Sequence, residues 1–308
     1  MSAENSGGDI PRQQIVVGTR GSALALIQAD IVAEALREKH DTEIKIEIIR
    51  TKGDDSILSR DPRAGRKGLF TSELESALIE RRIDVAVHSA KDLSSELKAG
   101  SAIAAVLPRG PVEDLLITKL PMRLESLPRS ATIATGSVRR RRQVGWHRSD
   151  VNFVDLRGNV PTRLRKFAAS DWDAIILARA GVERLSLSAP ILQFEGQEFF
   201  AQVLSPQQFV PSGGQGVIAL QTRAEKTTMA SAVDHAPTHL CLRAEREFLR
   251  LLQGDCDLPV GALALSVNGQ IDLSAQLFGE QTAPQMASAS GTDPERVAAQ
   301  VFSKINAA

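Results

Sequence analysis

The chain has 308 residues, 43% hydrophobic and 24% charged, and its basic and acidic residues balance to a formal net charge of zero. This length predicts two or three domains, and the charge balance argues against a dedicated nucleic-acid binder. Two cysteines do not make a disulfide framework, residues 1–14 lack the apolar core of a signal peptide, and no stretch approaches the length of a membrane span. We expect a cytoplasmic protein that needs no metal.

The first series of elements alternates between strand and helix patterns. Strands are expected at Ile15–Val17, Ile44–Ile49, Asp84–His88 and Ile103–Leu107, and helices at Ala23–Leu36 and from Ser72 to about Arg81. Ser22 can cap the first helix, and Ser72 to Glu75 forms a capping-box pattern for the second. The intervening segment, Thr51 to Gly68, has no periodicity and is interpreted as a mobile loop.

A second series repeats this alternation. Strands are expected at Leu115–Thr118, Thr132–Thr135, Val151–Leu156 and Ala174–Leu177, and helices at Val138–Trp146, from Pro161 and from Ala180. Val217–Leu220 is a late strand expected to rejoin the first series. The chain then continues with an amphipathic helix at Thr238–Leu252, a hairpin that turns at Asn268-Gly269, and a last helix from Pro294.

The alternation of strands and helices predicts parallel sheets in an α/β fold. We expect two α/β domains followed by a small C-terminal α+β domain. The first domain is drawn at residues 14–108 and 208–228, the second at 109–207, and the third at 229–308.

Charged residues follow the expected strands where α/β sheets bind their ligands, beyond the carboxyl ends. This rim carries Arg20, Ser22, Ser89, Lys91, Asp92, Ser137, Arg139, Arg140, Arg157, Arg163, Arg179 and Arg184. Because Arg holds carboxylates or phosphates through paired hydrogen bonds, the pattern predicts a polyanionic ligand in a cleft between the domains. Asp92 is the single obvious carboxylate on the rim, placed to stabilise a developing cation or to move protons.

Each of these features also has a simpler interpretation. The run Arg139–Arg142 could be a solvated helix face, Asp92 a turn or cap residue, and Cys256 a buried apolar residue. His88 is best interpreted as hydrogen-bonded and structural, and Gly213–Gly216 could be a simple turn. The coincidence of so many basic residues at one rim favours the binding site.

Several motifs resemble the porphobilinogen deaminase, or hydroxymethylbilane synthase, family, in family order across nearly the whole chain. They lie at Gly18–Gln28, Lys67–Glu75, Asp84–Leu93, Ser137–Arg140, Val151–Lys166, Asp173–Leu185, Gly213–Gly216, Ala244–Leu249 and Leu252–Gly261. The resemblance implies two periplasmic-binding-protein-like α/β domains with an interdomain cleft and a small α+β domain. It also implies a monomeric transferase of tetrapyrrole biosynthesis that binds neither nucleic acid nor membrane.

The chemistry that the resemblance implies is the condensation of four porphobilinogen units, each losing ammonia, onto a dipyrromethane cofactor. Cys256 matches the cysteine that carries this cofactor through a thioether, and linear hydroxymethylbilane is released by hydrolysis. Asp92 matches the catalytic aspartate, which stabilises the cation left when ammonia departs.

The resemblance also implies which residues bind the acetate and propionate groups of the pyrroles. The matching arginines are Arg20, Arg139, Arg140, Arg157, Arg163 and Arg184. Further cofactor and substrate contacts match Ser22, Lys67, Ser89, Lys91 and Ser137, and Phe70 matches a residue that can stack near the pyrroles. The loop before Lys67 is expected to be a lid.

The chain departs from the family pattern at a few positions. Asp255 replaces a glycine beside Cys256, where an acid would raise the thiol pKa, and Arg66 replaces a glycine before Lys67. Ala134 to Ser137 lacks one of the hydroxyls usual in that motif. The segment Ala189–Phe209 is longer than expected and rich in Gln and Phe.

Two rival functions remain at this stage. An anion-binding protein of the two-domain periplasmic type would need no chemistry at Cys256 and would normally carry an export signal. A nucleic-acid binder could use Arg139–Arg142, but only 4% of residues are aromatic and Tyr is absent, so a stacking platform is lacking.

Overall fold

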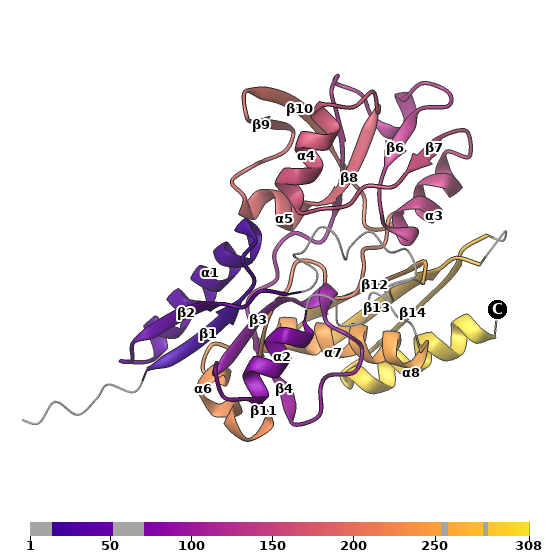
Figure 1. Cartoon of the computed structure of the whole chain (residues 1–308). Helices are drawn as coiled ribbons and strands as arrows, with labels where there is room; N and C mark the ends of the chain where they lie inside the picture. The colour runs from indigo at the N-terminus through magenta and orange to yellow at the C-terminus, as the bar shows by residue number, and fades with distance from the viewer. Residues whose placement is uncertain (1–13, 52–70, 254–257, 280–282, 308) are drawn as a thin grey trace, which may run out of the picture.

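Three β-sheets with flanking helices make up the computed structural model, which describes residues 14–51, 71–253, 258–279 and 283–307 (Figure 1). Two larger α/β units are built on the first two sheets, and the third sheet packs with the last two long helices into a small α+β unit. This is the expected fold class. No helix within the described ranges is long and apolar enough to cross a bilayer.

The first sheet has the strand order β2-β1-β3-β11-β4. Its strands are β1 (Ile15–Thr19), β2 (Ile44–Ile48), β3 (Val85–Ser89), β4 (Ser101–Val106) and β11 (Ile218–Arg223). Side chains of β3 alternate between its faces: Val85 and Val87 pack in the same cluster as α1 (Ala23–Lys39), whereas Ala86 packs with α2 (Ser72–Ile79). The late strand β11 rejoins this sheet, as predicted, and α6 (Thr227–Ser231) follows it.

The second sheet has the order β7-β6-β8-β5-β10-β9. Its strands are β5 (Asp114–Thr118), β6 (Thr132–Ala134), β7 (Asn152–Val154), β8 (Ala174–Ala178), β9 (Ile191–Phe194) and β10 (Gln197–Leu204). The helices α4 (Val160–Ala168) and α5 (Arg179–Arg184) pack in one cluster of this unit, and α3 (Val138–His147) packs in another.

The C-terminal unit is a three-stranded antiparallel sheet covered by two helices. It contains β12 (Val260–Val267), β13 (Gln270–Leu277), β14 (Gln285–Gly291), α7 (Ala236–Leu251) and α8 (Pro294–Asn306). The predicted Asn268-Gly269 turn is confirmed, with both residues at positive φ, 52° and 80°. Alternate side chains of β12 and β13 form a core with α7 and α8.

The expectation of parallel sheets is wrong for two of the predicted strands, and the β9–β10 hairpin adds a further antiparallel pair. β11 runs antiparallel to β3 and β4, and β5 runs antiparallel to β8 and β10. Both strands enter their sheet directly from the other unit, and each begins opposite the end of a neighbour: Ile218 pairs with Ser89, and Asp114 pairs with Ala178. A strand that starts at the rim must run away from it, opposite to the parallel strands that end there.

Smaller differences concern turns and caps. The long segment at 189–209 contains the β9–β10 hairpin, whose turn at Glu195 and Gly196 has φ values of 49° and 77°. The N-cap of α2 is Thr71, without a side-chain cap bond, instead of Ser72. The strand β14 was not predicted. The domain boundaries drawn above at residues 108, 207 and 228 stay a prediction.

Candidate functional site

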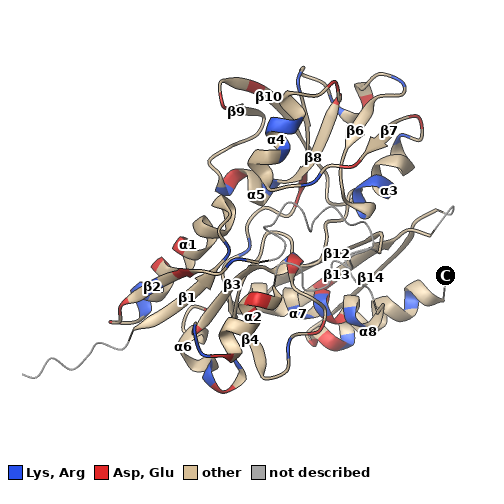
Figure 2. Cartoon of the chain, in the orientation of Figure 1, with Lys and Arg blue, Asp and Glu red and all other residues tan. Residues whose placement is uncertain are grey.

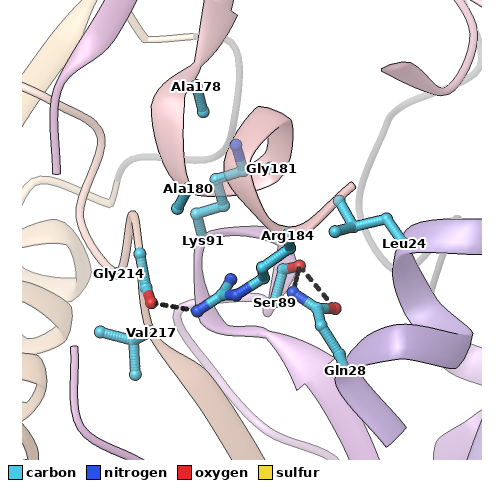
Figure 3. A pocket seen from close by; sticks show the side chains of 11 residues that line it. Leu24, Gln28, Ser89, Lys91, Ala178, Ala180, Gly181, Arg184, Gly214 and Val217 are labelled. Carbon is cyan, nitrogen blue, oxygen red and sulfur yellow. Dashed lines mark hydrogen bonds between the residues drawn. The ribbon is translucent and has the colours of Figure 1, made fainter. Parts of the chain in front are cut away.

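The rim residues of the two α/β units face each other across a small pocket. Gln28 of α1, Ser89 at the end of β3, Lys91 just after it, and Arg184 of α5 line it, together with Gly214, Gly216 and Val217 (Figure 3). Gln28 Nε2 lies 2.9 Å from Ser89 Oγ, and Arg184 Nη2 donates to Gly216 O at 2.7 Å. The structure therefore brings together three predicted site residues from different units.

Lys91 and Asp92 lie at the end of β3, in a 3-10 turn at Ala90–Asp92. Burial lowers the pKa of Lys91 to about 8, an effect that Asp92 opposes and that Arg140 and Arg163 reinforce. Burial likewise lowers the pKa of Arg163 to about 10, with Arg140 reinforcing and Asp92 opposing the shift. Residues of both α/β units thus share one electrostatic environment around the exposed carboxylate of Asp92.

Arg139 and Arg140 are buried at the start of α3 and share one carboxylate. Arg139 Nη2 lies 2.9 Å from Asp114 Oδ2, and Arg140 Nη2 lies 2.8 Å from Asp114 Oδ1. Burial would raise the pKa of Asp114, but the two guanidinium groups overcome it and hold that pKa well below its usual range. Arg140 Nε is buried and has no hydrogen-bond partner among the described residues.

Two sequence-based interpretations are corrected by this arrangement. Asp92 is not the single carboxylate at the rim, because Asp114 lies there as well. The run Arg139–Arg142 is not a uniformly solvated face, because Arg139 and Arg140 are buried. Asp114 was missed because only carboxyl ends of strands were considered, whereas β5 is antiparallel and begins at the rim. The sequence signal that could have revealed Asp114 is its position at the start of a strand that follows a crossover between the units.

Arg157 and Arg163 are held by the loop that joins β7 to α4. Arg157 Nε donates to Asp155 Oδ2 at 2.8 Å, and Arg163 Nε donates to Gly158 O at 2.6 Å. In Figure 2, much of α3 and part of α4 are coloured blue, which marks the Lys and Arg positions on these two helices. Arg20 is half-buried, and its charge lowers the pKa of His88 further than burial alone does.

Two serines predicted as ligand contacts act as helix caps. Ser22 Oγ accepts from Ala25 N, and Ser137 Oγ accepts from Arg140 N, each at 3.4 Å. The cap on α1 was predicted, and the cap on α3 fixes the turn that carries Arg139 and Arg140. The predicted residues Lys67, Phe70 and Cys256, and the departures at Arg66 and Asp255, lie outside the described residues.

The Ala134–Ser137 motif lacks a hydroxyl at Gly136, where the surrounding atoms leave little room for a side chain. A Cβ on Gly136 would lie 2.9 Å from Leu156 O and 3.1 Å from Arg157 Nε. Since the first of these atoms is backbone, a side chain at this position would require the segment after β7 to shift. The glycine therefore allows Leu156 and Arg157 to approach the start of α3 closely.

His88 has the structural role expected of it. The side chain is buried in the first unit, and Nε2 lies 2.9 Å from Gln221 Oε1. Gln221 in turn donates to Ser101 Oγ at 2.8 Å and to Glu75 Oε1 at 3.1 Å. Burial lowers the pKa of His88 to about 4, so the ring is neutral at physiological pH.

Comparisons with known proteins identify the family to which this sequence is similar. A family model described as porphobilinogen deaminase, dipyromethane cofactor binding domain, matches residues 15–231, and the model of the porphobilinogen deaminase C-terminal domain matches residues 239–305. The porphobilinogen deaminase of Desulforudis audaxviator is 41% identical over 268 residues, which cover 86% of this chain and 84% of that protein. That of Brevibacillus brevis is 39% identical over 292 residues, or 92% and 91% of the two chains.

Among solved structures, the periplasmic VFT2 domain of Bordetella pertussis BvgS is similar at a TM-score of 0.43 and 14% identity, covering 72% of this chain and 85% of that one. This likeness is too low to carry an argument. The two family models and the relatives, in contrast, cover most of the sequence. The chain belongs to the porphobilinogen deaminase family.

Proposed function

We propose that this chain is a hydroxymethylbilane synthase, a transferase that condenses four porphobilinogen units and releases linear hydroxymethylbilane and ammonia. Family membership supports the reaction class. The structural observation that carries the proposal is the shared environment of Asp92, Lys91, Arg140 and Arg163 at the facing rims of two units. Such a site suits a ligand that bears several carboxylates and develops positive charge at one point.

The cofactor implied by the matching family domain is dipyrromethane. We propose that it is attached through a thioether to Cys256, and that it supplies the acceptor to which the substrate units are joined. The described residues fit its acidic side chains. Arg140 retains a buried Nε without a partner among them, and Lys91 and Arg163 both interact electrostatically with Asp92.

The roles of the protein groups follow from their charges. Arg140, Arg163 and Arg184 would bind acetate and propionate groups, and Lys91 would add a fourth positive charge as long as it keeps its proton. Asp92 would stabilise the cation that forms when ammonia leaves the substrate. Its carboxylate is exposed at the rim and can therefore approach a ligand without first breaking a buried ion pair.

The catalytic role of Asp92 is tested with Asp92→Asn and a matched control, Asp150→Asn. Asp150 is an exposed aspartate whose ion pair with Arg148 lies in the second unit, away from the pocket. We expect both variants to fold and carry the cofactor, and ammonia release from porphobilinogen to fall at least about a hundredfold only in Asp92→Asn. Normal release by Asp92→Asn would refute the role, and binding without release by the wild type would favour an anion-binding protein.

A further inference from the structure

Two buried glutamine side chains join the arginine helix α3 to the C-terminal sheet. Gln143 on α3 is 1% exposed and Gln276 on β13 is 3% exposed. Gln143 Nε2 donates to Gln276 Oε1 at 2.7 Å. This contact links the second α/β unit to the unit whose first strand follows Cys256 in the sequence.

The direction of this hydrogen bond is fixed by the other partners of Gln143. Its Oε1 accepts from Arg139 Nη1 at 2.8 Å, so Nε2 must face the other way. There Nε2 also donates to Val210 O at 2.8 Å, and both of its hydrogens are used. The amide of Gln143 therefore has one orientation, with a donor pointing at Gln276.

The arginine pair belongs to the same network. Arg139 Nη1 donates to Val210 O at 3.0 Å, in addition to the contacts with Asp114 and Gln143. The guanidinium group of Arg139 is thus held from two sides, by Asp114 within its own unit and by Gln143, which itself is bound to β13.

The C-terminal sheet approaches closely at this point. Gly261 of β12 is paired with Gln276 in the sheet, and a Cβ on Gly261 would lie 2.4 Å from Val210 O. Ala262 N also donates to Pro211 O at 2.8 Å. Backbone contacts and the glutamine pair together fix the distance between α3 and this end of β12.

We propose that Gln143 and Gln276 are positioning residues, which hold Arg139 and Arg140 in register with the C-terminal unit. A ligand attached near the start of β12 would then present its carboxylates to the arginine pair at a fixed distance. This inference rests on the proposed function, since it assumes attachment at Cys256. Neither glutamine needs to touch the ligand itself.

The test uses the fact that Gln143 is the donor and Gln276 the acceptor of their hydrogen bond. Gln276→Glu keeps an acceptor for Gln143 Nε2, whereas Gln276→Met removes it and leaves a buried N–H without its partner. Gln276→Asn is a milder variant, which shortens the side chain and preserves folding if the Met variant does not fold. Gln143→Glu replaces both donors with an oxygen that faces Val210 O and Gln276 Oε1.

We expect the KM for porphobilinogen to stay within about twofold in Gln276→Glu. It should rise several-fold in Gln276→Asn and up to about tenfold in Gln276→Met and Gln143→Glu, the scale set by an unsatisfied buried donor. Intact mass confirms that each variant carries its cofactor. Gln202→Asn is the matched control, because it weakens a hydrogen bond to Leu124 N within the second unit and should lower the Tm with KM unchanged.

A purely structural role would lower the Tm of the Gln276 variants and leave KM unchanged, as in the control. That result, or equal KM values for Gln276→Glu and Gln276→Asn, would overturn the proposal. Failure of the proposed function looks different, because the wild type would then lack an adduct and release no ammonia.

Discussion

The Glu245 side chain on α7 contacts segments that join all three units, and its removal tests how much these contacts stabilise the folded protein. The carboxylate is 0% exposed. It binds Arg109 Nη1 at 2.6 Å, Gly214 N at 2.6 Å and Ala264 N at 2.7 Å. Arg109 lies on the crossover between β4 and β5, Gly214 on the return crossover, and Ala264 in β12.

Glu245→Ala leaves a guanidinium group that is 11% exposed without its carboxylate, and two backbone N–H groups without their acceptor. Breaking a buried ion pair by removing one partner costs about 3–5 kcal/mol. At about 2–3 °C per kcal/mol for a chain of this size, the Tm should fall by about 10 °C.

Glu295→Ala is the matched control, because the Arg243–Glu295 pair also starts from α7 but is 50% and 48% exposed. Such a surface pair contributes less than about 1 kcal/mol. Thermal and urea unfolding followed by circular dichroism would measure both variants. Equal shifts for Glu245→Ala and Glu295→Ala would refute the reasoning that Glu245 joins the units.

Three further predictions concern pH and backbone conformation. Because burial lowers the pKa of His88 from 6.5 to about 4, the unfolded state binds a proton that the folded state does not, and the free energy of unfolding should fall by about 1.4 kcal/mol per pH unit as pH drops from 6.5 to 4. Urea unfolding of the wild type and His88→Asn at several pH values measures this, and equal slopes would contradict it. Lys91 should lose its proton near pH 8, so KM for porphobilinogen should rise above that pH in the wild type but not in Lys91→Arg; parallel KM profiles would count against this. Gly216→Ala should lower the Tm more than Gly269→Ala, since both have positive φ but only at Gly216 would a Cβ lie 2.5 Å from Gly110 O; similar losses would show that the close approach does not matter.

Local patterns in the sequence were sufficient for most elements of the fold. The Asn268-Gly269 turn, the Ser22 cap and the proline at the start of α4 are confirmed, because each depends on neighbouring residues alone. The direction of β5 and β11 was beyond such patterns. It depends on where the chain enters a sheet after crossing from the other unit, which no local periodicity records.

In the candidate site, too, local motifs predicted some residues, whereas contacts between distant parts of the chain were not predicted. The sequence predicted Ser89, Lys91 and Arg184 at the ligand-binding rim, and the structure brings them to one pocket. The motifs did not reveal that Arg139 and Arg140 share Asp114, or that Gln143 reaches Gln276, because these partners are 25, 26 and 133 residues apart in the chain. Pairing over such separations is decided by how the units pack.

The central claim, a polyanionic ligand tethered to this chain and extended there, is tested most directly by the intact mass of the purified protein before and after incubation with porphobilinogen. The account predicts a mass above that of the sequence by one dipyrromethane, mapping to Cys256, and further stepwise increments upon incubation. Cys256→Ser should fold and show neither. An unmodified wild-type mass that gains no adduct, or an adduct retained in Cys256→Ser, would contradict the account.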